Sequence, residues 1–142
     1  MDADKTARRC AERMYADDAA SQALGITISD VAPGTAIAAM TVREDMANGH
    51  GICHGGYLFT LADTAFAFAC NTYDDVTVAA GGDINFVEPV SKGANLIATA
   101  VEVHRRGRSG LYDVTVRADD GTVVAEFRGR SRSLGRPLLK GG

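Results

Sequence analysis

The most restrictive feature of this sequence is one long segment that carries almost no charge. Between Tyr57 and Tyr73 the only charged residue is Asp63. The apolar residues of this segment recur at the three- and four-residue intervals of an α-helix, at Leu58, Leu61, Ala62, Ala65, Phe66 and Ala69. We therefore predict a helix from Tyr57 to about Asn71 that is buried on nearly all sides, so the rest of the chain has to enclose it.

Most of the remaining sequence alternates between apolar and polar residues, which is typical of β-strands with one buried face. The predicted strands lie within residues 26–29, 37–42, 76–78, 84–87, 96–103, 111–116 and 123–131, with Gly81-Gly82 and the hairpin signal Asp120-Gly121 among the breaks between them. The segment from Asp4 to Ala20 has helical spacing. These patterns predict an α+β fold in which an antiparallel sheet of five or six strands curls around the central helix, with a further helix at the N-terminus.

The composition is that of a single folded domain. The chain has 142 residues, of which 46% are apolar and 23% charged, and its net charge of −3 gives no electrostatic basis for binding nucleic acid. No apolar run approaches the ~18 residues that cross a bilayer, and the N-terminus is acidic where a signal peptide is apolar. Three cysteines without CxxC spacing fit neither a disulfide framework nor a zinc ribbon. We expect a cytoplasmic protein that binds no membrane, with one domain over residues 1–142 and a flexible tail at 135–142.

A glycine-rich loop leads into the central helix. Residues 48–56 read Asn-Gly-His-Gly-Ile-Cys-His-Gly-Gly, and we expect Gly55 and Gly56 to precede the helix immediately. Their N–H groups are then among the first-turn donors without a partner inside the helix, and glycine lets a carbonyl oxygen approach them closely. The same loop could hold phosphate, or it could be a tight turn with a purely structural role.

Asp63 is the second candidate for chemistry. A carboxylate on an apolar helix is costly unless it is used or paired, so the alternatives are a functional acid and a structural ion pair with an arginine. With a rise of 1.5 Å per residue, Asp63 lies roughly 10–12 Å along the helix from Gly55, too far for both to contact one carbonyl group. If two copies pack their central helices antiparallel about a two-fold axis, Asp63 of one copy approaches Gly55 of the other. We therefore predict an obligate homodimer with shared sites.

The loop, together with Leu61-Ala62-Asp63-Thr64-Ala65-Phe66-Ala67, resembles the hotdog-fold acyl-CoA thioesterases, particularly the phenylacetyl-CoA thioesterase (PaaI) type. Residues 84–89, Ile-Asn-Phe-Val-Glu-Pro, look like the third strand of that family, and the resemblance covers nearly the whole chain. It implies a hotdog fold and hydrolysis of phenylacetyl-CoA, ring-hydroxylated phenylacetyl-CoA or a related aryl or medium-chain acyl-CoA to the free acid and CoA. It also implies a dimer of dimers, and no cofactor apart from the CoA of the substrate.

Site roles follow from the same resemblance. Asp63 matches the catalytic acid, Gly55 the N–H that polarises the thioester carbonyl, and Asn48 and His54 the loop residues that shape the site. Whether Asp63 acts as nucleophile or as general base stays open. Some relatives carry a serine ten residues before the proline of the third strand; here that residue is Ala79, which puts a serine-assisted variant of the mechanism in doubt.

Arginines are the candidates for binding the CoA phosphates. The predicted turn contains Arg105, Arg106, Gly107, Arg108 and Ser109, and Gly56 joins them as a substrate-binding candidate. The alternative for the turn is a solvated basic loop. Arg128, Arg130 and Arg132 share one strand face and form a second group.

Other chemistries fit the sequence less well. His50, Cys53 and His54 do not have a recurrent zinc-ligand spacing, so we expect no metal. The alternative functions are a hotdog acyl-CoA hydratase or dehydratase, whose Gly-Asp-x-Asn-Pro-x-His string is absent, and a non-catalytic acyl-CoA-binding module.

Overall fold

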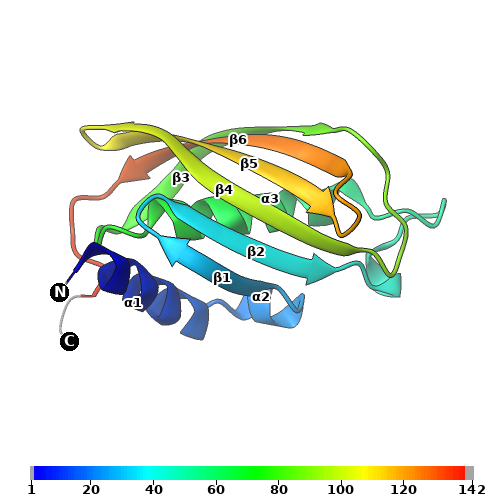
Figure 1. Ribbon diagram of the computed structural model, residues 1–142, viewed down its shortest axis with the longest axis horizontal. Helices are drawn as coiled ribbons and strands as arrows, with labels where there is room; N and C mark the ends of the chain where they lie inside the picture. The colour runs from blue at the N-terminus through cyan, green and yellow to red at the C-terminus, as the bar shows by residue number, and fades with distance from the viewer. Residues whose placement is uncertain (1, 140–142) are drawn as a thin grey trace.

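The computed structural model describes residues 2–139, and these form a six-stranded antiparallel sheet packed around one helix (Figure 1). The strand order is β1-β2-β4-β5-β6-β3, so β1 and β3 are the two edge strands. The strands are β1 (Thr27–Ala32), β2 (Thr35–Thr41), β3 (Thr77–Phe86), β4 (Asn95–Arg106), β5 (Ser109–Ala118) and β6 (Val123–Ser133). The predicted α+β architecture is confirmed, with six strands.

The central helix α3 (Gly55–Cys70) lies against one face of this sheet, behind it in the view of Figure 1. Eight of its residues are buried, Leu58, Leu61, Ala62, Ala65, Phe66, Phe68, Ala69 and Cys70. They meet the inward-facing residues of the strands, such as Ala98 and Ala100 of β4 and Val114 of β5, in one hydrophobic core. Outward-facing residues of the same strands alternate with them, as the period of two predicts.

The boundaries of α3 differ from the prediction at one end. Gly55 and Gly56 do not precede the helix; they are its first two residues, and His54 is the N-cap. The first turn begins earlier than the apolar spacing indicates because the first residues of a helix need no apolar face of their own. Their backbone N–H groups remain first-turn donors.

The predicted N-terminal helix is divided in two. Helix α1 (Ala3–Ala16) ends at Asp17, and the short helix α2 (Ala19–Ala23) begins after Asp18, whose carboxylate accepts hydrogen bonds from the N–H and hydroxyl of Ser21. The prediction of one helix to Ala20 was wrong because Asp18 caps a new helix. Helix α1 packs against β1.

Strand β3 also differs from the prediction, because Gly81 and Gly82 lie inside one strand and do not separate two. A bulge between Ala79 and Gly81 accommodates one extra residue, and the strand continues to Phe86. At Gly82, a Cβ atom would lie 2.8 Å from Cζ of Phe127. The glycine thus permits close packing within the sheet and does not end the strand.

The start of β3 is tied to the end of α3 by Asn71. The buried Asn71 amide donates to the carbonyl oxygens of Ala67 and Thr77, both at 2.9 Å, and accepts from the Thr77 N–H at 2.9 Å. This clamp fixes the edge strand relative to the helix that carries Asp63.

The last described residues run back along the segment before β3. The N–H of Val76 donates to the Arg136 carbonyl at 2.8 Å, and the N–H of Leu139 donates to the Asp74 carboxylate at 2.7 Å. These two hydrogen bonds fall within the predicted tail at 135–142, whose flexibility stays a prediction, and residues 140–142 lie outside the described part.

Candidate active site

Asp63 lies in a surface pocket between the central helix and the edge strand. The pocket has a volume of about 260 Å³ and is lined by Phe59, Asp63, Phe127 and the small residues Ala79 to Gly82 of β3. The rings of Phe59 and Phe127 meet edge to face, with centroids 5.3 Å apart. The carboxylate therefore stands beside an aromatic wall and opposite a strand segment that has almost no side-chain volume.

Asp63 has no ionic partner in this part of the structure. Within residues 2–139, no side chain forms a salt bridge or hydrogen bond with its carboxylate. Burial raises the pKa of Asp63 above its ordinary value, because the ionised form loses hydration without gaining a counter-charge. The alternative of a structural ion pair with an arginine is not realised in the described chain. An unpaired, partly buried carboxylate beside a pocket is suited to act as a base or a nucleophile.

The first turn of α3 supplies the unpaired N–H groups that the sequence predicted. His54 caps the helix without a side-chain hydrogen bond, and its carbonyl accepts from Tyr57 at 3.0 Å. Among the described residues, the N–H groups of Gly55 and Gly56 have no acceptor. Two free donors at the positive end of a 16-residue helix form an arrangement that can stabilise negative charge on an oxygen.

Asn48 organises the loop before the helix. Its side-chain oxygen accepts from the N–H groups of His50 at 2.9 Å and Ile52 at 3.3 Å, and its own N–H donates to the Ile52 carbonyl at 2.8 Å. The N–H of His54 donates to the Met46 carbonyl at 2.8 Å, which joins the loop to the 3-10 helix η1 (Glu44–Met46). Asn48 thus has a structural role in shaping the loop, whatever else its amide nitrogen contacts.

Gly55 and Asp63 lie at separate places along β3. Gly55 packs against Phe86 at the end of β3, whereas Asp63 shares its pocket with Ala79 to Gly82, nearer the start of the strand. Eight residues of helix put them about 12 Å apart along the axis. One chain therefore does not bring the two groups to the same carbonyl carbon.

The arginine turn lies at the other end of α3 from Gly55. In Figure 1 the turn between β4 and β5 is on the left, and the loop before α3 is on the right. Arg105, Arg108 and Ser109 line the same small cavity as Cys70, the last residue of α3. A single chain separates the predicted phosphate ligands from Gly55 and Gly56 by the length of the helix.

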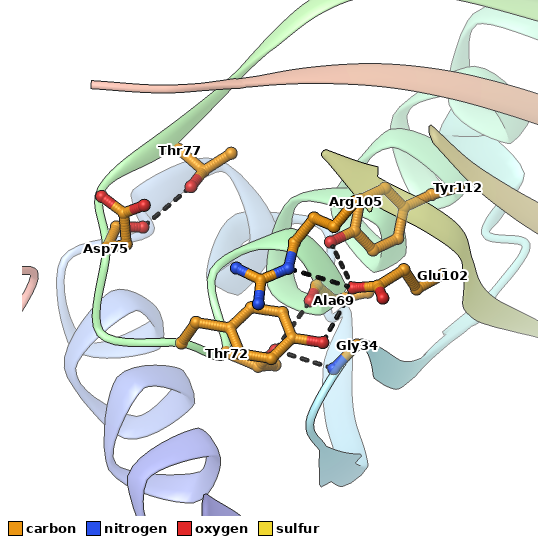
Figure 2. Close-up of polar contacts among 9 residues, drawn as sticks. Gly34, Ala69, Thr72, Asp75, Thr77, Glu102, Arg105 and Tyr112 are labelled. Atoms are coloured by element: carbon orange, nitrogen blue, oxygen red, sulfur yellow. Dashed lines mark hydrogen bonds and ion pairs between the residues drawn. The ribbon is translucent and has the colours of Figure 1, made fainter. Parts of the chain in front are cut away.

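Arg105 is committed to contacts inside the chain (Figure 2). Its guanidinium carbon lies 3.5 Å from the centroid of the Tyr73 ring, and its Nε is 3.7 Å from Oε1 of Glu102. The hydroxyl groups of Tyr73 and Tyr112 donate to the same Glu102 oxygen at 2.8 and 3.1 Å. Burial, followed by the hydrogen bond to Glu102, raises the pKa of Tyr73 to about 12, so this phenol remains a donor at neutral pH.

The remaining arginines differ in whether an acidic side chain already pairs with them. Arg128 forms a bidentate pair with Asp113 at 2.7 and 2.9 Å, and Arg130 pairs with Asp83 at 3.2 Å. Arg106, Arg108 and Arg132 are exposed, and within residues 2–139 none of them forms a salt bridge. Arg132 is the register partner of Ser109, so these three arginines lie close to one turn.

Metal ligands do not gather in the described chain. Residues 2–139 contain no group of three or more His, Cys, Asp or Glu side chains that could hold a metal ion. Cys10, Cys53 and Cys70 are all buried, unpaired thiols. Among the described helices, none has the length and apolar character needed to cross a bilayer.

Comparison with known proteins places the chain in a family. The model of the thioesterase superfamily matches residues 50–125, which contain the loop from His50, the whole of α3 and β3 to β5. The chain belongs to the thioesterase superfamily. Its match to that family includes Gly55 and Asp63 but begins two residues after Asn48.

Several relatives of this superfamily member are similar over most of its length. It is 45% identical to the acyl-coenzyme A thioesterase PaaI of Escherichia coli over 125 residues, and this matched stretch is 88% of this chain and 89% of the relative. The structure of the E. coli PaaI protein from the phenylacetic acid degradation operon superposes with a TM-score of 0.94 at 42% identity, covering 96% of this chain and 99% of that one. A mutant of the phenylacetic acid degradation protein PaaI from Thermus thermophilus gives a TM-score of 0.77 at 40% identity, covering 80% and 97%. The hotdog fold expected from the loop and helix motifs is confirmed.

Some residues of the site escaped the sequence patterns. Phe127 lines the Asp63 pocket and Phe86 covers Gly55, yet both have the spacing of ordinary strand residues. Glu102 and Tyr112 are register partners on neighbouring strands. Strand alternation predicts the face on which each residue lies but not which residue of the next strand it pairs with. No local signal in the sequence identifies these contacts, because each depends on pairing between segments that are distant in the chain.

Proposed function

We propose that this protein is an acyl-CoA thioesterase, which uses water to hydrolyse an acyl-CoA to a carboxylic acid and free CoA thiol. The observation that carries the proposal is the unpaired Asp63 carboxylate in a pocket between α3 and β3, on a helix whose first N–H groups are free. Membership of the thioesterase superfamily and 45% identity to an acyl-coenzyme A thioesterase support the same reaction.

Asp63 would attack the thioester or activate water. As a nucleophile, its oxygen adds to the carbonyl carbon and the CoA thiolate leaves, giving a mixed anhydride that water then cleaves. As a general base, it takes a proton from water while the water oxygen adds to the same carbon; the tetrahedral intermediate then expels the CoA thiolate, which takes up that proton as the acid forms. In both routes Asp63 must be ionised. The raised pKa makes the ionised carboxylate a stronger base than that of an exposed aspartate.

Gly55 would supply the main donor to the carbonyl oxygen, with Gly56 beside it. Negative charge develops on that oxygen when the carbonyl carbon becomes tetrahedral, and a fixed N–H at a helix N-terminus stabilises it without reorganisation. Asn48 and His54 would shape this end of the site and orient the carbonyl or the attacking water. Ala79 lines the Asp63 pocket and brings no hydroxyl to it, so the proposed reaction uses no serine there.

A homodimer would bring the two halves of the site together. Strand β3 is a ten-residue edge strand with an unpaired side, and Val78 on it is exposed. Pairing of two β3 edges about a two-fold axis would continue the sheet and align the central helices antiparallel. Asp63 of one chain would then face Gly55 of the other, giving two equal sites, and two such dimers would form a tetramer.

The substrate would be held by its CoA as well as by its acyl group. Arg106, Arg108 and Ser109, with Gly107 in the turn, are the proposed ligands of the CoA phosphates, and Arg132 is close enough in register to join them. Arg105 is better explained as a residue that holds this turn to Tyr73 and Glu102. The reaction would need no cofactor, since CoA arrives with the substrate. The cytoplasmic location stays a prediction.

We propose phenylacetyl-CoA, a ring-hydroxylated phenylacetyl-CoA or a related aryl acyl-CoA as the acyl donor. The rings of Phe59 and Phe127 and the small residues Ala79 to Gly82 line the pocket beside Asp63, and an aromatic lining favours an aryl group. A hydratase or dehydratase reaction is the alternative, and it differs in product because it leaves the thioester intact.

Release of thiol from phenylacetyl-CoA, followed with a thiol reagent, tests the function. We expect turnover by the wild-type protein and a loss of about 10²- to 10⁴-fold in kcat for Asp63→Asn, with CoA binding retained. Hydration of crotonyl-CoA is the parallel assay, and hydration without thiol release would favour the alternative. Equal activity of Asp63→Asn and wild type would assign Asp63 a structural role and refute the mechanism.

A further inference from the structure

Phe86 is an aromatic residue in an unusual position, at the end of β3 and beside the first residue of α3. It pairs in register with the buried Ala125, so its side chain lies on the face of the sheet that carries the helix. Even so, 56% of its surface is exposed, more than for any other large apolar residue among the described ones. In the single chain, a ring directed toward the core face yet open to solvent is available to contact a ligand or a partner chain.

The ring occupies the space in which Gly55 would carry a side chain. A Cβ atom at Gly55 would lie 2.9 Å from Cζ of Phe86 and 3.3 Å from each Cε atom. At Gly56 a Cβ atom would meet only Nδ1 of His54, at 3.8 Å. Of these two glycines, only Gly55 is thus closely covered by another side chain, and a methyl group there would require the Phe86 ring to shift. The partner in that contact is Phe86, from an edge strand that follows the helix in the chain.

This contact links the proposed oxyanion donor to the edge strand. The ring covers the side of Gly55 on which a Cβ atom would stand, in the residue whose N–H would hold the thioester carbonyl. A carbonyl group bound at Gly55 would also place its attached acyl group within reach of the open part of the ring.

We propose that Phe86 is a specificity-determining residue, which packs over Gly55 and presents its exposed ring to the acyl group of the substrate. The inference rests on the proposed thioesterase function. It predicts preference for acyl groups with a flat or bulky apolar surface over acetyl, because only the former can cover the ring.

Phe86→Ala, Phe86→Leu and Val87→Ala test the acyl contact with phenylacetyl-CoA and acetyl-CoA as probes. We expect Phe86→Ala to lower kcat/KM for phenylacetyl-CoA by about tenfold or more and for acetyl-CoA by less than about threefold. Phe86→Leu should recover part of the difference. Val87 is the neighbouring exposed apolar residue, and the atoms nearest a Cβ at Gly55 all belong to Phe86, so Val87→Ala should match wild type with both substrates.

Gly55→Ala, alone and combined with Phe86→Ala, tests the packing contact without reference to activity. Gly55→Ala should lower the melting temperature in the wild-type background and leave it unchanged or raise it in the Phe86→Ala background, where the ring is absent. The double variant Gly55→Ala/Phe86→Ala should hydrolyse acetyl-CoA faster than Gly55→Ala alone, because alanine keeps the N–H and the ring no longer clashes with its methyl group.

Three results would overturn the inference. They are equal loss of kcat/KM with both acyl groups in Phe86→Ala, dissociation of the assembly by this substitution in light scattering, and additive effects of Gly55→Ala and Phe86→Ala on melting temperature. Failure of the proposed function looks different, because the wild-type protein would then release no thiol from either substrate while the melting-temperature coupling persisted.

Discussion

Mixing two inactive variants tests whether each active site draws on two chains. The first variant, Asp63→Asn, keeps the shape of the side chain but removes the carboxylate. The second, Gly55→Pro, removes the N–H at the first helical position, where proline is tolerated and where the extended conformation of His54 suits a following proline. The added ring atoms would meet Phe86, so a thermal unfolding curve must first show that Gly55→Pro is folded.

The expected magnitude follows from the helix geometry. Both groups must lie within about 3 Å of the reacting carbonyl, so they can be no more than about 6 Å apart, whereas one helix separates them by about 12 Å. Each homodimer of a single variant should therefore lose about 10²-fold or more in kcat. In a 1:1 mixture half of the dimers are mixed, and each mixed dimer keeps one intact site of two. The mixture should recover about one quarter of the wild-type activity.

The assay uses two affinity tags, one on each variant, and measures thiol release after subunit exchange. Purification through both tags removes assemblies that hold only one variant, so the activity of the remaining assemblies should exceed that of the unfractionated mixture. Mixed dimers that carry both tags and yet have no activity above the parents would refute the shared site.

Further outcomes are expected. Activity should fall at acid pH as Asp63 is protonated, with a midpoint above the ordinary range of aspartate pKa values because burial raises this pKa; a pH–kcat profile that stays flat down to pH 4 would contradict it. The same raised pKa means that the ionised Asp63 costs stability at neutral pH, so Asp63→Asn should unfold at higher urea concentration at pH 7, and the difference should vanish as pH falls below the unfolded-state pKa. Replacing Arg106 and Arg108 by glutamine should raise KM for acyl-CoA more than for the corresponding acyl-pantetheine, and equal changes would remove both residues from the phosphate site. Gly129→Ala should cost about 1–3 kcal/mol in urea unfolding, because its Cβ would lie 2.9 Å from three ring carbons of the fully buried Phe66.

The turn between β4 and β5 illustrates where local patterns stop being informative. The sequence shows three arginines in four residues and treats them alike. In the fold all three arginines are exposed, but the strand register turns Arg105 toward Tyr73 and Glu102, whereas Arg106 and Arg108 form no salt bridge within residues 2–139. Alternation along β4 predicts which side chains share a face, but the bulge between Glu102 and His104 shifts that alternation before Arg105. The sequence of β4 does not reveal the bulge, because a bulge depends on pairing with the partner strand.

What the sequence determined by itself is the set of local features whose causes lie within a few residues. The spacing of apolar residues specifies α3, the lone acid at Asp63 stands out against it, and the paired glycines mark the start of the helix. The tertiary structure alone decided which distant residues meet: Phe86 on Gly55, Phe127 beside Asp63, and Gly81-Gly82 inside β3. Helical periodicity is a property of consecutive residues, whereas these contacts depend on strand register and on the space left by side chains packed from other segments.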